Sequence, residues 1–176
     1  KINVDKNYTA SASPSDLVSV DASAMNMAVY TVTATANGTS KAYIENAKIT
    51  AGKLTVKTQG TSRAIASKGG STASMSVAGV GVLVMKAYAQ GTFEAYINGG
   101  NINVTGLDIL TEYDADAYAR SIQSNGGVSL SLVSGNVNLA EAAVTTKAHA
   151  YTKGSLNCTS SGDVNVKAWV KDNGTI

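Results

Sequence analysis

One nine-residue phrase recurs along the chain, and this internal repeat limits the possible architecture more than any other feature. Residues 41–49 read KAYIENAKI, residues 94–102 read EAYINGGNI, and a looser copy occupies residues 150–156. Each copy carries one tyrosine, and the sequence numbers of these tyrosines differ by 53 and then by 55: Tyr43, Tyr96 and Tyr151. A period of this length is typical of stacked repeats, in which each unit buries its apolar face against its neighbours.

The match extends well beyond this phrase. At an offset of 53 in the numbering the shared residues are mostly small or aliphatic, and many lie two positions apart. They include Ala34/Ala87, Ala42/Ala95, Ile44/Ile97, Leu54/Leu107, Ala64/Ala117 and Ala66/Ala119. Period two is typical of a β-strand, whose successive side chains point to opposite faces. Because Arg63 becomes Asp116 and Ile65 becomes Tyr118, we expect the shared residues to face a core and the variable residues to face outward.

The repeats divide the chain into approximate units. We place them at 2–53, 54–106 and 107–163, with the start of a fourth at 164–176, so that 1–176 forms a single domain. The chain opens and closes inside the pattern, and we therefore expect a fragment of a longer protein. A solenoid cut in this way exposes unpaired edges, which predicts end-to-end association of the fragment.

The composition favours an all-β solenoid. Seventeen Gly, one Phe and one Trp indicate a narrow core of small residues, and one Pro is compatible with long hydrogen-bonded ladders. Turn residues separate about six segments in each repeat: 54–59, 62–68, 72–79, 80–90, 92–97 and 101–105. We predict a right-handed parallel β-helix with two coils of about 26 residues per repeat. Three shorter coils per repeat remain an alternative.

Charge and hydropathy argue against two classes of partner. The formal net charge is +2, and no basic run is interleaved with aromatic residues, which disfavours nucleic acid. No apolar run approaches the roughly 20 residues that a membrane span requires, so we expect no membrane insertion by this segment. The pattern also suggests no cofactor.

The cadence of residues 42–58, AYIENAKITAGKLTVKT, followed by alternating alanines to Ala66, resembles the passenger repeats of large filamentous adhesins. It is similar to the filamentous-haemagglutinin type and to leukotoxin-like adhesins and autotransporters of fusobacteria. The resemblance covers nearly the whole chain. It implies a right-handed β-helix, secretion to the extracellular space or the bacterial cell surface in association with the outer membrane, and attachment to host cells or toxicity toward them. It carries over no catalytic residues.

Candidate catalytic and metal-binding residues are few. His149 is the only histidine and lies on the outward side of an alternating run, where a solvated residue is the favoured interpretation. Glu112, Asp114 and Asp116 share one face of a strand, and carboxylates in pairs can cleave glycosides or bind calcium. Gln59, Thr61 and Arg63 hold the same positions one repeat earlier. We therefore interpret the acidic group as variable, solvent-facing residues on the outer side of the strand, and we predict no enzyme and no metal site.

Two features remain. Cys158 is the only cysteine, and we expect it to be a buried free thiol. Tyr43, Tyr96 and Tyr151 point outward if their alanine and isoleucine neighbours point inward, so they form a column with a spacing of about 10 Å. Exposed aromatic rings can stack on sugars or receive a protein, and these three residues are the candidate binding residues.

Three functions follow. The favoured one is a structural or adhesive segment of a secreted bacterial adhesin or toxin passenger whose partner is a host cell-surface receptor or glycan. A carbohydrate-active enzyme on a β-helix, similar to a polysaccharide lyase or hydrolase, is the second, and a direct glycan- or protein-receptor-binding module is the third.

Overall fold

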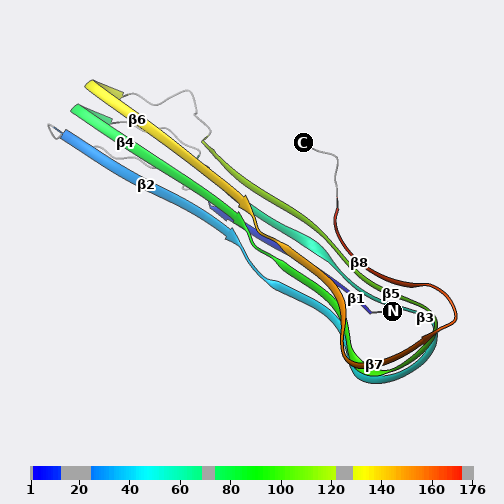
Figure 1. Ribbon diagram of the computed structural model, residues 1–176. Helices are drawn as coiled ribbons and strands as arrows, with labels where there is room; N and C mark the ends of the chain where they lie inside the picture. Colours follow the sequence, from blue (N-terminus) through cyan, green and yellow to red (C-terminus); the bar gives the residue numbers. More distant parts are fainter. Residues whose placement is uncertain (1, 13–24, 69–73, 122–128, 172–176) are drawn as a thin grey trace.

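The computed structural model describes residues 2–12, 25–68, 74–121 and 129–171, and this part of the chain is built of strands without a helix (Figure 1). The predicted all-β class is therefore confirmed. The strands are β1 (Ile2–Ala12), β2 (Met25–Ala36), β3 (Thr39–Lys68), β4 (Ser74–Ala89), β5 (Thr92–Ser121), β6 (Ser129–Val144), β7 (Lys147–Ser160) and β8 (Val164–Val170).

All strand pairs are parallel, and they form two sheets. One sheet has the order β1-β3-β5-β7 with β8 also paired to β5, and the other has the order β2-β4-β6. The 30-residue strands β3 and β5 bend round one end of the molecule (Figure 1). Each coil thus has an outgoing run before the bend and a returning run after it. In the second full coil these runs are residues 74–98, paired with β6 and β7, and 107–121, paired in part with β8, and the bend lies between them.

The strand register shows how much chain separates neighbours in space. Thr39 pairs with Thr92 and Ala66 with Ala119, so positions that differ by 53 in the numbering lie side by side. The prediction of two coils per repeat is therefore wrong. The six predicted short strands merge into long ones, because Gly52 and Gly60 lie inside β3 without the positive φ angle that would turn the chain.

The core lies between the outgoing and returning runs, as two clusters. Near the bend it is aliphatic and includes Ile44, Leu54, Val56, Ile97, Ile102, Leu107 and Ile109. Farther along, alanine dominates, with Ala34, Ala36, Ala64, Ala66, Ala87 and Ala89 around Val32, Leu83 and Met85. The residues shared between copies at an offset of 53 thus face inward as expected, and Ala64 and Ala66 are fully buried. Small side chains let the two layers approach closely along this stretch.

The bend uses left-handed backbone at the same place in successive coils. Asn46 has φ 46°, Gly99 has φ 64° and Gly154 has φ 70°. This conformation is readily adopted by glycine and tolerated by asparagine. Gly100 adds a second such residue with φ 103°, directly beside Ala47 of the neighbouring strand. The bend therefore depends on Asn and Gly residues with positive φ, and the alternating pattern of apolar residues in the sequence gives no sign of them.

Candidate binding face: the tyrosine column

The three candidate tyrosines lie side by side on adjacent strands. Tyr43 of β3 pairs with Tyr96 of β5, which pairs with Tyr151 of β7. The ring centroids are 5.2 Å and 5.0 Å apart, and the rings are inclined by only 11° and 13°. The expected spacing is wrong by a factor of two, because residues one repeat apart occupy adjacent strands. Their neighbours Ala42 and Ile44 are buried, so the tyrosine column (Tyr43, Tyr96 and Tyr151) lies on the outer side of the sheet.

Stacking decides which parts of these rings a ligand could reach. Tyr96 is only 8% exposed, although it points outward, because the rings of its two neighbours cover its faces. Tyr43 is 49% exposed and ends the column. A sugar that stacks on an aromatic face would therefore find the open face of Tyr43, whereas the middle of the column offers ring edges.

The side-chain ammonium of Lys153 lies over two rings of the column. The Lys153 ammonium lies 4.4 Å from the centroid of the Tyr96 ring and 6.0 Å from that of Tyr151. A cation over a tyrosine ring is attracted by the negative ring face, by about 0.5–1 kcal/mol at an exposed site. In the same row Asn98 donates a 2.7 Å hydrogen bond to the Glu45 carboxylate. The tyrosine column is thus flanked by a row of polar side chains: Lys153 contacts the tyrosine rings, and Asn98 is hydrogen-bonded to Glu45.

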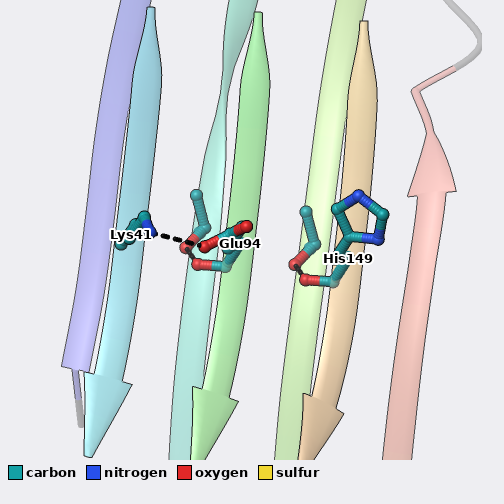
Figure 2. A network of polar contacts seen from close by, with 5 residues as sticks. Lys41, Glu94 and His149 are labelled. Atoms are coloured by element: carbon teal, nitrogen blue, oxygen red, sulfur yellow. Dashed lines mark hydrogen bonds and ion pairs between the residues drawn. The ribbon is translucent and has the colours of Figure 1, made fainter.

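A second row on the same face contains Lys41, Glu94 and His149 from three neighbouring strands (Figure 2). The Lys41 ammonium forms a 3.0 Å ion pair with Glu94, and this hydrogen bond and the charge of Glu94 raise the pKa of Lys41. The His149 side chain is exposed, which agrees with the interpretation as a solvated strand residue. This row is not apparent from the motifs of the sequence, although the offset of 53 places Lys41 next to Glu94.

Hydroxyl groups of the returning runs donate hydrogen bonds to the backbone of this row from the core side. Thr58 donates a hydrogen bond to the backbone carbonyl of Glu94, and Thr111 donates one to the backbone carbonyl of His149. Both threonines are fully buried. The face that carries the tyrosine column is therefore tied to the opposite layer at each turn.

The acidic residues expected to share a face lie on the returning run of β5, and basic residues of β3 neutralise several of them. Glu112 forms a 2.8 Å ion pair with Lys57, and Arg63 binds Asp116 at 2.7 Å. Farther toward the bend, Asp108 is bound by Lys53 at 2.6 Å. The described residues contain no group of three or more His, Cys, Asp or Glu that could hold a metal ion.

Hydrogen bonding affects one of these carboxyl groups in particular. The Lys53 ammonium and then the Asn165 amide, at 2.9 Å, donate to Asp108 and hold its pKa below the ordinary value of 3.8. These contacts stabilise the ionised form, which suits an ion pair that links coils. A general acid would need the opposite shift of its pKa.

A shallow polar hollow lies beside the acidic group. It is lined by Gln59, Gly60, Thr61, Glu112, Tyr113, Asp114 and Lys171. It offers amide, hydroxyl, carboxylate and ammonium groups for hydrogen bonding and is open to solvent. It belongs to the returning layer, so it is separate from the tyrosine column.

The expectation for Cys158 is wrong, because the thiol is exposed. Cys158 pairs with Ile102, which is fully buried, so the two side chains belong to the same inward row. The difference arises because β7 is an edge strand, with β5 on one side only. An inward residue of an edge strand lacks the neighbour that would cover it.

Comparison with known proteins identifies no relative: no protein-family model, curated protein or solved structure matches the chain. Within the described ranges there is no helix of the length and hydropathy needed to cross a membrane.

Proposed function

We propose that the chain is a right-handed parallel β-helix whose turn length equals the separation of the stacked pair Arg63 and Asp116, 53 in the numbering. We further propose that it serves as a structural and adhesive segment of a secreted bacterial adhesin or toxin passenger, outside the cell or at the outer-membrane surface. The observation that carries this proposal is the register of β3 and β5, which places residues that differ by 53 in the numbering side by side from Thr39–Thr92 to Lys68–Ser121. A rod built in this way can hold binding elements away from a cell surface.

The carboxylates support a structural role over a catalytic one. Asp108, Glu112 and Asp116 each bind a cation of the preceding coil. These pairs tie successive coils together, whereas a glycosidase needs one protonated carboxyl group and one free carboxylate facing a shared substrate. Release of reducing ends from bacterial or host polysaccharides by the purified chain would favour the enzyme instead.

The second candidate is direct binding of a host glycan or receptor at the tyrosine column. It is favoured by the 49% exposure of Tyr43, which stacks on one ring only and ends the column. A sugar ring could stack on Tyr43 and accept hydrogen bonds from neighbouring hydroxyl groups. In this proposal the partner is a cell-surface carbohydrate or a protein with an exposed planar group.

One experiment separates the two candidates. The whole chain and its Tyr43→Ser variant would be tested on a glycan array and for binding to host cells. Tyr118→Ser is the matched control, because Tyr118 is 52% exposed and lies outside the column. A module that binds through the column loses binding with Tyr43→Ser and retains it with Tyr118→Ser. A rod without its own receptor site shows no saturable binding in any of the three proteins.

A further inference from the structure

Two asparagine–glycine dipeptides lie within the described ranges, and their surroundings differ. Asn37-Gly38 occupies the break between β2 and β3, whereas Asn98-Gly99 lies inside β5. Asparagine is one of the chemically labile side chains of proteins. A glycine that follows it has no Cβ atom to crowd its own amide nitrogen, which can then attack the asparagine side chain. The two dipeptides therefore share the same intrinsic reactivity, and the fold decides which of them reacts.

The side chain of Asn37 is exposed, and it forms no hydrogen bond with the part of the chain that the structure describes. The backbone on either side of it is tied to the next coil through carbonyl oxygens. Ala36 O accepts a hydrogen bond from Gln90 N, and Gly38 O accepts one from Thr92 N, both at 2.8 Å. Neither bond uses the amide nitrogen of Gly38, so this nitrogen is available as a nucleophile.

The side chain of Asn98 is held in place. Its Nδ2 donates a 2.7 Å hydrogen bond to the Glu45 carboxylate, and its backbone pairs with Glu45 on one side and Lys153 on the other. The following Gly99 is buried and has φ 64° as part of the bend. Rotation of the Asn98 side chain toward the Gly99 nitrogen would break the bond to Glu45. The fold therefore protects this dipeptide.

We propose that Asn37 is a site of spontaneous modification, with water as the only co-reactant. The Gly38 nitrogen attacks Cγ of Asn37, the bond from Cγ to Nδ2 breaks, and the Gly38 proton leaves with that nitrogen as ammonia. Water then opens the cyclic imide. Opening at Cγ leaves an aspartate in a normal backbone, and opening at the backbone carbonyl carbon leaves an isoaspartate, whose main chain runs through the former side chain.

Both products change the junction between the two sheets. The chain passes here from the sheet of β2 to the sheet of β3, and the Ser62 hydroxyl also donates to Ala36 O, at 3.4 Å. Each product places a carboxylate where a neutral amide was. The isoaspartate also lengthens the main chain by a methylene group between the acceptors Ala36 O and Gly38 O, which weakens the bonds between the first and second coils. The proposal is independent of any receptor bound by the tyrosine column.

Ageing of the whole chain tests the selection of the site. The chain would be incubated at mildly alkaline pH, folded and in urea, and then digested with trypsin. Cleavage after lysine and arginine places the two dipeptides in separate peptides, 7–41 and 87–120. Asn125 and Asn173, also followed by glycine, lie outside the described residues and fall in other peptides. Mass spectrometry gives the deamidated fraction of each peptide, and an isoaspartyl methyltransferase detects the isoaspartate.

In the folded chain, peptide 7–41 should deamidate at least roughly tenfold faster than peptide 87–120, because an exposed break opens more readily than a paired strand. In urea the two rates should become similar, since both dipeptides are then free. Equal rates in the folded chain overturn the proposal. A difference that persists unchanged in urea also overturns it, because the sequence and not the fold would then select the site.

Two variants assign the reaction to these residues. Asn37→Gln should remove the isoaspartate from peptide 7–41, because the longer side chain closes the imide slowly. Glu45→Ala releases the amide of Asn98 and should raise deamidation of peptide 87–120 severalfold, with peptide 7–41 unchanged. Circular dichroism verifies that both variants remain folded. Isoaspartate that persists in peptide 7–41 of Asn37→Gln, or an equal response of both peptides to Glu45→Ala, overturns the proposal.

Discussion

The Thr58 hydroxyl donates a 2.6 Å hydrogen bond to the backbone carbonyl oxygen of Glu94, 36 residues farther along the chain. One coil later Thr111, the strand neighbour of Thr58, makes the same bond to His149 at 2.8 Å. A fully buried hydroxyl thus joins the returning run to the outgoing run of the next coil in each case. This recurring bond sets the distance between the two layers at the level of the Lys41–Glu94 row.

Removal of one such hydroxyl should weaken the fold by a measurable amount. We expect Thr111→Val to lower the free energy of unfolding by about 1–3 kcal/mol, because the carbonyl of His149 loses its partner while the shape is kept. Thr111→Ser retains the donor and serves as the control, with a smaller loss caused by the missing methyl group. Urea unfolding followed by circular dichroism measures both. Equal losses in the two variants would show that packing, and not the hydrogen bond, dominates.

The tyrosine column should be most sensitive at its centre. Tyr96 stacks on two rings and Tyr43 on one. An aromatic pair contributes roughly 0.5–1.5 kcal/mol beyond the area it buries, so Tyr96→Ala should cost about twice as much stacking energy as Tyr43→Ala. The free energy of unfolding in urea and the near-ultraviolet circular dichroism of the tyrosines test this order. A larger loss for Tyr43→Ala would contradict the stacked arrangement.

Two glycines of the described strands should respond in opposite ways to the same change. Gly100 has φ 103°, and a Cβ atom there would collide with the backbone of Ala47. Gly100→Ala should therefore cost more than about 1 kcal/mol, or prevent folding. At Gly52 the nearest atom to an added Cβ is Thr105 Oγ1 at 3.9 Å, an ordinary contact. Gly52→Ala should leave the midpoint of thermal unfolding unchanged or raise it, since the substitution lowers the conformational entropy of the unfolded chain without straining the folded one.

Acid should weaken the fold through Asp108. Its pKa in the folded chain lies below the ordinary value of 3.8, because Lys53 and then Asn165 donate hydrogen bonds to it. The ionised group therefore contributes its full stabilisation above this ordinary value, and the contribution is lost as the pH falls through the folded-state pKa. Asp108→Asn should give a lower free energy of unfolding at neutral pH and a flatter decline in acid. A decline as steep as that of the wild type would assign the acid sensitivity to other carboxyl groups.

The sequence predicts the inward and outward sides of the strands well. Ala64, Ala66 and Ile97 are buried as their alternation indicates, and the tyrosines lie in one outward column. The physical reason is that a residue shared between coils at a fixed offset must meet a like residue on the neighbouring strand. Composition and period together are enough for the all-β class.

The number of coils per repeat could not be predicted in the same way. Gly60 separates two of the predicted short segments, 54–59 and 62–68, yet it lies within β3. The bend depends on the φ angles of Asn46, Gly99 and Gly154, which short-range patterns do not distinguish from those of other Asn and Gly residues. The exposure of Cys158 could not be predicted either, since it depends on β7 being an edge strand.

The separation between paired residues is not constant along the stack, and this variation has an evolutionary consequence. From β5 to the last coil, the sequence numbers of paired residues differ by 55 before the bend, at Asn98 and Lys153, and by 57 after it, at Leu107 and Val164. One extra residue enters at the irregularity opposite Gly99, and another near Gly162, where the strand is interrupted. The ladder recovers its alignment after each insertion. The bend is thus a place where a lineage can lengthen or diversify the chain, one residue at a time, without disturbing the core.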